Sequence, residues 1–391
     1  MMNYDFDQII DRRGSDSTKH DALLQWYGKS DLLPMWVADM DFATPDFITD
    51  AIKERLDHPI FGYTFKSERY NKAIIDWVGS HHDWHIKGEW ISFIPGIIRG
   101  VGMAMVSLLE AGDKVIIMPP VYYPFRNVAE HNHLEVVENP LRRTEDGRYE
   151  IDFENLEKVA DSRCKMLILA NPHNPIGIVW SRETLIRLAE FCHSRGIIVI
   201  SDEIHCDMAL WDNRHIPFAS VSSKAAECSI TFGAPSKTFN IAGVVASYAI
   251  VSNDAIREKF FGWMEGNELN QPNIFATIAT IAAFENGEAW RQKMIAYVEE
   301  NINFTIEFCR EHIPQIVAVR PDASFLVWLD CRALNLSHDE LIDLFLNKAK
   351  LALNDGAIFG KGGDGFMRFN VGTPRATLHQ ALKQLQEALN K

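Results

Sequence analysis

Lys237 is the residue whose surroundings in the sequence most suggest a chemical role. It stands in "TFGAPSKTFNIAG", directly after the apolar run "SITF". Burial disfavours the charged form of a lysine, so an ammonium beside a buried strand end must be paired, neutralised or used chemically. Taken alone, Lys237 is also compatible with an ordinary surface lysine after a strand. The residues that follow other apolar runs decide between these interpretations.

Three further functional groups follow other apolar runs. Tyr122 comes after "KVIIM", Asn174 lies in "NPHNPIG" after "KMLILA", and Asp202 follows "GIIVIS". Because ligands bind beyond the carboxyl ends of the strands in parallel sheets, we expect these groups to meet Lys237 at one edge of a sheet. That edge would combine an aromatic ring, an amide, a carboxylate and an amine.

A flat pyridinium aldehyde cofactor, pyridoxal phosphate, would use every member of this set. Lys237 would bond to the aldehyde, and Asp202 would pair with the ring N–H group. Asn174 would contact the ring oxygen, while Tyr122 would cover one face of the ring. In "PGIIRGV", Gly96 precedes an apolar helical run, so backbone N–H groups at a helix N-terminus could hold the phosphate. The sequence therefore predicts a pyridoxal-phosphate site.

Simpler interpretations exist for several of these residues. Asp202 could cap a turn, and Tyr122 could be an ordinary packing residue after a strand. A hydrolase dyad of Ser236 and Lys237 is disfavoured, because adjacent side chains of an extended segment point to opposite faces.

A metal site is not predicted. His81 and His85 have a helical i, i+4 spacing in "HHDWH", but no carboxylate or cysteine pattern accompanies them. The glycine-rich "FGKGGDGF" lacks the ending of a phosphate-binding loop, so we interpret it as a turn that leads into the strand carrying Arg368.

The segments that must position these residues alternate between strand and helix patterns. One helical pattern begins at the N-cap Ser181 and ends near Gly196. This alternation predicts an α/β fold with a mostly parallel sheet sandwiched by helices. Five apolar, β-branched runs predict its buried strands: 114–118, 134–138, 165–170, 196–201 and 247–252.

The pattern of elements also predicts the domain organisation. Residues 46–286 hold the alternating elements and would form the large cofactor-binding domain. From residue 287 the pattern changes to a long helix followed by mixed strands and helices, which predicts a smaller α+β domain over 287–391. Residues 1–45 show little periodicity, and we expect them to join the small domain.

Composition limits the possible partners and the compartment. The chain has 39 Lys and Arg against 53 Asp and Glu, a net charge of −14, which argues against nucleic acid or an anionic membrane as a partner. Its longest apolar stretch is too short to span a bilayer, and the first residues lack an apolar core of signal-peptide length. Six cysteines without a CxxC pair suggest reduced thiols. We therefore expect a cytoplasmic protein.

Several motifs in order along the chain carry a family resemblance. The segments "NPHNPIG", "SDEIHCD", "APSKTFNIAG" and "MRFNVGTPR" resemble the fold type I pyridoxal-phosphate enzymes of the aminotransferase superfamily. The segments "MWVADMDF" and "HPIFGYT" narrow this to the cystathionine β-lyase branch typified by MalY and PatB. The resemblance covers nearly the whole chain, and the set of motifs is specific although each motif alone is modest.

The resemblance implies roles for individual residues. Lys237 would be the catalytic lysine that forms the Schiff base, Asp202 would pair with the pyridine nitrogen, and His205 would also bind the cofactor. Arg368 would clamp the α-carboxylate of an amino-acid substrate, which suits the forked donors of a guanidinium. Trp36 would be a wall of the substrate pocket, although ordinary core packing remains open for it. Asn174 would contact both the cofactor and the substrate, and Tyr122 would stack on the ring.

The phosphate-binding residues follow from the same resemblance. Tyr63 would reach the phosphate from the neighbouring subunit of a homodimer with shared active sites. Val245 stands where many aminotransferases have an arginine for the phosphate, and Gly233 stands where relatives often have a hydroxyl. Within one subunit, the residues implied to hold the phosphate are Gly96, Ile97, Ile98 and Ser236.

The activity implied by the resemblance is β-elimination at a carbon–sulfur bond. The substrate would be cystathionine or a related cysteine S-conjugate, and the products would be a thiol, pyruvate and ammonia. Transamination would use the same residues and remains an alternative. A non-catalytic interaction module that merely holds pyridoxal phosphate is a third possibility, which the presence of both Lys237 and Arg368 disfavours.

Overall fold

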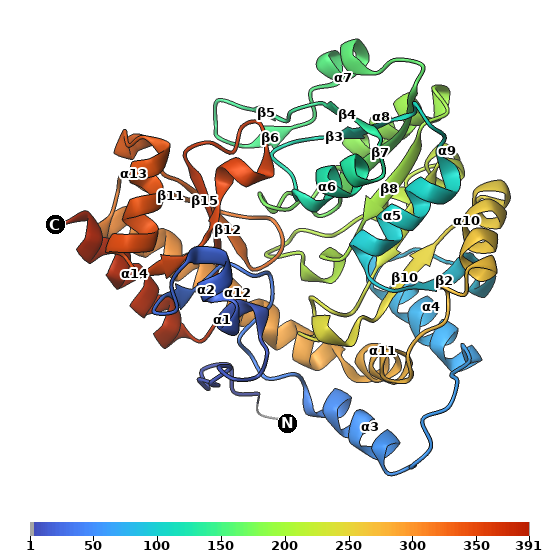
Figure 1. Ribbon diagram of the computed structural model, residues 1–391, viewed down its shortest axis with the longest axis horizontal. Coiled ribbons are helices and arrows are strands. Elements are labelled where there is room, and N and C mark those ends of the chain that lie inside the picture. Colours follow the sequence, from blue (N-terminus) through green and yellow to red (C-terminus); the bar gives the residue numbers. More distant parts are fainter. Residues whose placement is uncertain (1–3, 391) are drawn as a thin grey trace.

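A seven-stranded sheet forms the centre of the large part of the molecule in the computed structural model, which describes residues 4–390 (Figure 1). Its strand order is β2-β10-β9-β8-β7-β3-β4, and every neighbouring pair is parallel except the two that involve β10. The prediction of a mostly parallel sheet is confirmed. The strands are β2 (Ile91–Ile94), β3 (Lys114–Ile117), β4 (Glu135–Glu138), β7 (Cys164–Ala170), β8 (Ile198–Asp202), β9 (Ser229–Gly233) and β10 (Ser247–Ile250).

Helices cover both faces of this sheet because its strands are apolar on both sides. In β7, Met166 and Ile168 belong to a buried cluster with residues of α5, whereas Leu167 and Leu169 belong to a different cluster with residues of α8. Successive side chains of a strand point to opposite faces, so this alternation buries both faces. The helices on the α5 side are α5 (Ile97–Leu108), α6 (Pro124–His131) and α10 (Asp254–Gly266), and those on the other side are α8 (Arg182–Ser194) and α9 (Ser223–Glu227).

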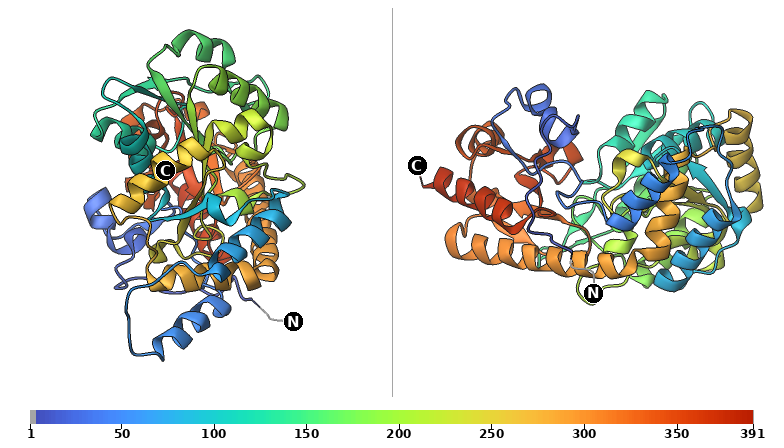
Figure 2. Two further views of the ribbon diagram at one scale, coloured as in Figure 1. Left: turned by 90° about the vertical axis from the view of Figure 1, so that its right-hand side faces the viewer. Right: turned by 90° about the horizontal axis from the view of Figure 1, so that it is seen from below.

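A smaller antiparallel sheet forms the second part of the chain, with the order β11-β12-β15-β14. The long helix α12 extends from the large part into the small part (Figure 2). The elements are α12 (Glu288–His312), β11 (Val317–Val319), β12 (Leu326–Asp330), α13 (His338–Asp343), β14 (Asn354–Asp355), β15 (Phe366–Asn370) and α14 (Arg375–Leu389).

The N-terminal segment lies against the small part, beside the C-terminal elements (Figures 1 and 2). It contains α1 (Thr18–Asp21), α2 (Leu23–Tyr27) and β1 (Leu33–Pro34), and β1 pairs in parallel with β13 (Leu351–Ala352). The domain boundaries after residues 45 and 286 stay predictions, although the nearest strands on either side of each boundary belong to different sheets.

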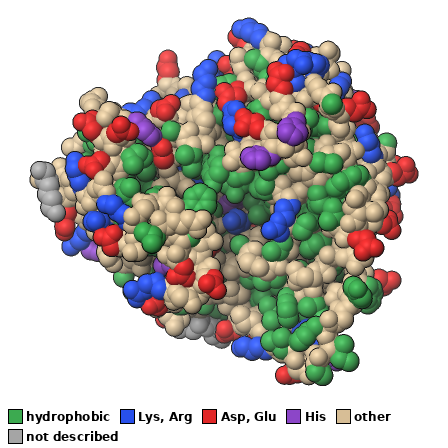
Figure 3. Space-filling model, viewed as in Figure 1, with side chains coloured by type: hydrophobic (Ala, Val, Ile, Leu, Met, Phe, Trp, Pro, Cys, Tyr) green, Lys and Arg blue, Asp and Glu red, His purple; other side chains and the backbone are tan. Residues whose placement is uncertain are grey.

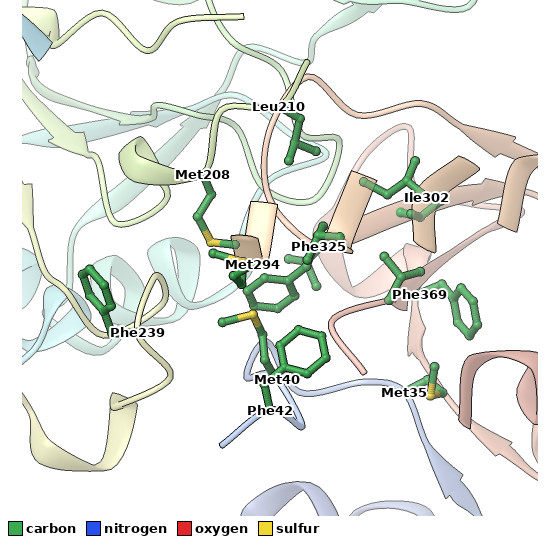
Figure 4. Packing of buried hydrophobic residues seen from close by; sticks show 14 of the residues in the cluster. Met35, Met40, Phe42, Met208, Leu210, Phe239, Met294, Ile302, Phe325 and Phe369 are labelled. Atoms are coloured by element: carbon green, nitrogen blue, oxygen red, sulfur yellow. The ribbon is translucent and has the colours of Figure 1, made fainter. Parts of the chain in front are cut away.

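A large apolar cluster fills the junction between the two parts. It contains Met40 and Phe42 from the N-terminal segment, Met208 from the large part, and Met294 and Phe325 from the C-terminal part (Figure 4). Close packing of this kind holds the segments in one arrangement. The remaining elements are α3 (Asp46–Leu56), α4 (Glu68–His82), α7 (Phe153–Val159), α11 (Ile274–Asn286), β5 (Arg142–Arg143) and β6 (Tyr149–Glu150).

Three details differ from the sequence predictions. The run 134–138 was predicted to be a buried strand, but β4 lies at the edge of the sheet and its residues are only partly buried or exposed, because a strand at an edge has a neighbour on one side only. The helix α4 ends at His82, and Asp83 has a left-handed backbone with φ of 50°, so His81 and His85 do not share a helix face. Asp202 is the last residue of β8 and not the first residue after it. Among the described residues, no helix has both the length and the apolar character needed to cross a membrane.

Candidate active site

A cavity of about 300 Å³ opens at the carboxyl ends of β7, β8 and β9, next to the N-terminus of α5. The surface is hollowed where the large and small parts meet, and Lys or Arg atoms lie inside the hollow (Figure 3). The loops after three neighbouring parallel strands end at this edge, which is where the sequence placed the site. The predicted residues that line the cavity are Gly96, Ile97, Ile98, Tyr122, Asn174, Asp202, His205, Ser236 and Lys237.

Lys237 is held at the cavity by a carbonyl from the N-terminal segment. Its Nζ donates a hydrogen bond to the backbone oxygen of Ala38 at 2.6 Å. Burial lowers the pKa of Lys237 to about 8; among the nearby charges, Asp39 and Asp202 oppose this shift, whereas Arg368 adds to it. The amine is therefore partly neutral near physiological pH, as a nucleophile or a base must be.

Asp202 presents a buried carboxylate that receives one hydrogen bond from the described residues, which its Oδ1 accepts from the N–H of Ile204 at 3.1 Å. Burial raises the pKa of Asp202 to about 7. His205 lies close by, and its Nδ1 is 3.2 Å from the hydroxyl of Ser324. Burial lowers the pKa of His205 to about 3, with further lowering from the charges of Lys237 and Arg368, so this ring is neutral. Asp202 can therefore accept a cationic N–H group from a ligand.

Tyr122 and Asn174 are joined through the backbone. The N–H of Tyr122 donates to the carbonyl oxygen of Asn174 at 3.1 Å, so the loops after β3 and β7 are held together. The Tyr122 ring packs edge-on against Phe125, with the ring centroids 5.6 Å apart. Burial raises the pKa of Tyr122 to about 12, so its hydroxyl stays protonated. An aromatic face and an amide thus lie at the same mouth of the cavity.

Arg368 is a buried guanidinium on β15 without a carboxylate partner among residues 4–390. It donates to Asn174 Oδ1 at 3.0 Å, to the carbonyl of Trp36 at 3.0 Å and to Asn354 Oδ1 at 2.5 Å. Its Nε has no partner among the described residues. Burial lowers the pKa of Arg368 to about 10. A buried cation that is bound only by neutral acceptors is suited to receive an anionic group from a ligand.

The N-terminus of α5 supplies the anion-binding feature of the cavity. Gly96 is the N-cap residue, and its φ of +111° is a conformation that glycine adopts without strain. The first N–H groups of a helix have no acceptor within it, so those of Ile97 and Ile98 are free for a ligand. Arg99 also lines the cavity, and sequence reasoning missed it. Arg99 could have been found from the sequence, because it lies in the first turn of a predicted helix that follows a glycine.

The structure bears on the two positions, Gly233 and Val245, at which the sequence lacks a phosphate-binding side chain that many relatives have. A Cβ atom on Gly233 would lie 2.7 Å from the ring of Tyr248, so a serine or threonine cannot enter that position without movement. Val245 lines the cavity with a left-handed backbone, φ 58°. The cavity therefore has neither a hydroxyl at Gly233 nor an arginine at Val245 for an anion.

Three predicted residues lie outside the cavity lining. Arg368 is connected to the cavity through Asn174, whose Oδ1 accepts its hydrogen bond. The Trp36 side chain packs edge-on against Tyr27, with the ring centroids 5.2 Å apart, and only its carbonyl contacts Arg368. Tyr63 is fully exposed on the loop between α3 and α4. The assignment of a cofactor or substrate role to any of these three residues stays a prediction.

Glu203, which follows Asp202, faces away from the cavity. Its carboxylate pairs with His215 Nε2 at 2.8 Å and accepts hydrogen bonds from the Ser201 hydroxyl and the Phe218 N–H group. Asp202 is the last residue of β8 and Glu203 is the first residue after it, and the hydrogen bonds of Glu203 hold its carboxylate apart from that of Asp202. The carbonyl of Ala38 was also missed, because a backbone acceptor has no signature in the sequence.

The residues present fit pyridoxal phosphate on structural grounds. The buried carboxylate of Asp202 has no second donor among residues 4–390, and a protonated ring nitrogen would supply one. The free N–H groups at the start of α5 suit a phosphate, and the amine of Lys237 suits an aldehyde. These three features surround one cavity.

Comparison with known proteins agrees with this arrangement. The family model of aminotransferase class I and II matches residues 30–385. The chain is 44% identical to cystathionine beta-lyase PatB of Bacillus subtilis, over 98% of this chain and 100% of PatB. It is 33% identical to protein MalY of Escherichia coli, over 99% of both chains. Cystalysin from Treponema denticola, which contains pyridoxal 5'-phosphate, superimposes with a TM-score of 0.95 and 33% identity, over 100% of this chain and 99% of cystalysin. The chain belongs to the aminotransferase class I and II family.

Proposed function

We propose that this protein is a pyridoxal-phosphate-dependent carbon–sulfur β-lyase. Its substrate is cystathionine or a related cysteine S-conjugate, and its products are a thiol, pyruvate and ammonia. The full-length similarity to PatB supports the reaction type. The structural observation that carries the proposal is a pair of basic groups at one site, the half-buried amine of Lys237 and the buried guanidinium of Arg368. A lysine amine near an arginine that has no carboxylate partner among residues 4–390 suits an amino-acid substrate.

The residues that would hold the cofactor surround the cavity. Lys237 would bond to the aldehyde carbon, and Asp202 would pair with the ring nitrogen. Asn174 and His205 would lie at the polar edge of the ring, with Tyr122 against one face. The phosphate would bind at the N-terminus of α5 and Ser236, and Arg99 would add the positive charge that Val245 does not provide. When bound, the cofactor supplies an electron sink that stabilises negative charge on the substrate Cα.

Lys237 is the residue that moves the proton in this proposal. With a pKa of about 8, about a tenth of the amines would be neutral at pH 7. Lys237 would be bonded to the cofactor only until the substrate amine replaces it, and its released neutral amine then removes the proton from Cα as a general base. The carbonyl of Ala38 orients the amine by accepting a hydrogen bond from it.

Arg368 holds the substrate while the bonds change. Its guanidinium would bind the α-carboxylate and fix the Cα–H bond in front of Lys237. The Cα proton passes to the amine, the Cβ–S bond breaks, and its electron pair leaves with the sulfur. The sulfur takes up a proton to give the thiol, and water converts the remaining three-carbon unit to pyruvate and ammonia.

We further propose a homodimer in the cytoplasm. The loop between α3 and α4 exposes the apolar side chains of Ile60, Phe61, Tyr63 and Phe65. A contiguous exposed apolar patch is typical of an interface, and a second subunit would cover it. All six cysteines are buried and unpaired, which is consistent with a reducing compartment.

Chemical trapping tests the proposed function at its reactive residue. Borohydride reduction of the cofactor-loaded protein, followed by peptide mapping, should place the label on Lys237. A coupled assay should detect pyruvate from L-cystathionine with the wild-type protein and not with Lys237→Ala. A label on a different lysine would refute the residue assignment, and loaded protein that forms no pyruvate would refute the lyase proposal.

A further inference from the structure

The backbone carbonyls of residues 36–42, here called the 36–42 segment, reach both cations of the site. The carbonyl of Trp36 accepts from Arg368 at 3.0 Å, and the carbonyl of Ala38 accepts from Lys237 at 2.6 Å. The two carbonyls are two residues apart in a bent part of the chain, where the N–H of Asp39 donates to the carbonyl of Val37 at 2.9 Å. A single short segment therefore contacts the amine on the large part and the guanidinium on the small part.

Asn240 ties this segment to the loop that carries Lys237. Its Nδ2 donates to the carbonyls of Met40 and Phe42 at 2.9 and 2.8 Å, and its Oδ1 accepts from the Met40 N–H at 3.0 Å. Asn240 follows Lys237 by three residues and has a φ of 55°, a left-handed conformation that asparagine tolerates better than most residues. The Asn240 amide therefore makes three hydrogen bonds to the 36–42 segment, two as a donor and one as an acceptor.

Asn370 ties the same segment to the strand that carries Arg368. Its Nδ2 donates to the carbonyls of Val37 and Asp39 at 2.6 and 2.7 Å, and its Oδ1 accepts from the N–H of Gly372. Asn370 follows Arg368 by two residues on β15, so both side chains point to the same face. Asn370 is 1% exposed, which makes an unsatisfied carbonyl there costly.

Ion pairs and apolar packing brace the segment from its other sides. Arg12 bonds Asp39 at 2.7 Å and Asp41 at 2.9 Å, and the fully buried Lys19 bonds Asp41 at 2.8 Å. The side chains of Met40 and Phe42 enter the junction cluster (Figure 4). The segment therefore has little freedom to follow a cation that moves.

We propose that Asn240 and Asn370 are positioning residues for the two cations of the site. Asn240 fixes the segment against the Lys237 loop, so that the Ala38 carbonyl meets the amine. Asn370 fixes the segment against β15, so that the Trp36 carbonyl meets the guanidinium. The two amides thus set the relative position of the proton-transfer group and the carboxylate-binding group across the junction. The kinetic part of this inference rests on the proposed function.

The proposal predicts different kinetic effects for the two amides. Asn240→Gly keeps the left-handed backbone and should lower kcat for L-cystathionine about tenfold or more, because small misplacements of a reacting group are costly. Asn370→Ala should mainly raise KM, by a similar factor, because it loosens Arg368. Asn301→Ala is a matched control: Asn301 is buried and also donates to two carbonyls, those of Val371 and Thr373 at 2.9 and 2.8 Å, neither of which belongs to the 36–42 segment. Its kcat and KM should stay within about twofold of wild type.

A second measurement needs neither cofactor nor substrate. Competitive acetylation of the cofactor-free chain at a series of pH values reports the pKa of Lys237. The charged groups that act on Lys237 are Asp39, Asp202 and Arg368, and none of the variants changes them. In Asn240→Gly and in Asn370→Ala the Ala38 acceptor is no longer held against the ammonium, so the midpoint should fall, whereas Asn301→Ala should leave it unchanged.

The outcomes separate this inference from the proposed function. Equal kinetic losses in all three variants, or wild-type kinetics and labelling in Asn240→Gly and Asn370→Ala, would overturn the positioning role. If Asn370→Ala does not fold, Asn370→Ser keeps a small polar group there and should show the same rise in KM. If the wild type forms no pyruvate, the proposed function fails, and an unchanged labelling midpoint in Asn240→Gly would still refute the positioning of Lys237.

Discussion

Arg368 is the single side chain whose environment most requires a ligand. Three neutral oxygens accept its hydrogen bonds, and burial lowers its pKa to about 10. A substrate carboxylate would supply the missing negative charge in a dry site, where charge-assisted bonds are strong. The sequence could predict this role from residue type and family pattern, but the absence of a carboxylate partner is visible only in the fold.

Arg368→Ala should therefore weaken substrate binding and leave the cofactor spectrum unchanged. The loss of a charge-assisted pair should cost about 1.5 to 3 kcal/mol, which corresponds to a rise in KM of roughly 10- to 150-fold. Steady-state kinetics and an absorbance spectrum measure both effects. Arg332→Ala removes an arginine at the end of the neighbouring strand β12, paired there with Asp330, and serves as the control. Wild-type saturation kinetics for Arg368→Ala would assign it a structural role.

Asp202 should give the cofactor-free protein a characteristic pH dependence. Its pKa is raised to about 7 by burial, against about 3.9 in an unfolded chain. Between these values the folded state binds one more proton than the unfolded state, so the free energy of unfolding falls by about 1.4 kcal/mol per pH unit as the pH rises. This contribution is complete below pH ~4 and lost as the pH passes ~7.

Denaturant unfolding of the cofactor-free wild type and of Asp202→Asn at several pH values tests this dependence. The neutral amide has no such proton, so the variant should gain stability relative to wild type as the pH rises from 4 to 7, and the difference should level off above that range. Parallel stability curves for the two proteins would show that the Asp202 carboxyl has an ordinary pKa.

Strands and helices were predictable where their residues alternate between two apolar faces. The N-cap Ser181 is confirmed, because its side chain accepts from the N–H of Thr184 at 3.2 Å. The antiparallel direction of β10 was not predictable, since an apolar run in a buried strand looks the same in either direction. The short strand β2 lacks a pattern long enough to recognise. Contacts made by backbone carbonyls, such as that of Ala38, depend on the path of the chain and leave no trace in residue types.

Gly233 is the last residue of β9, and the packing around it leaves no room for a side chain that could bind a ligand. A side chain there would meet the ring of Tyr248 on the neighbouring strand β10. Gly233→Ser should therefore lower the free energy of unfolding by about 1 to 3 kcal/mol, as overpacking does in a well-packed interior. Thermal unfolding measures the loss. The double variant Gly233→Ser with Tyr248→Leu should recover part of it, and a loss that is the same with either residue at position 248 would exclude the clash.

The whole molecule brings functional residues together from distant parts of the chain. The amine on the large part, the guanidinium on β15 and the N-terminal carbonyls converge only because the junction is closely packed. The proposed second subunit would add Tyr63 from its exposed loop. Local sequence signals could not predict that residues so far apart in the sequence share one site; the resemblance to a family of enzymes predicted it.

Shared active sites make a testable prediction for the assembly. Tyr63→Ala and Lys237→Ala should each be impaired, but a heterodimer of the two should contain one site with both wild-type residues. After subunit exchange at equal concentrations, activity should recover to about a quarter of the wild-type value. Size-exclusion chromatography checks the dimer, and tagged subunits check the exchange. Complete exchange without any recovery would contradict a shared site.

The stoichiometry of products from L-cystathionine tests the central claim most directly. Elimination expels a group that is already bonded beside the carbanion, whereas transamination must deliver a proton to the cofactor carbon and then needs a keto acid. A barrier difference of about 1.4 kcal/mol makes one outcome tenfold faster. The account predicts homocysteine, pyruvate and ammonia in equal amounts without added keto acid. Turnover that requires a keto acid and yields its amino acid stoichiometrically would contradict the lyase and establish an aminotransferase.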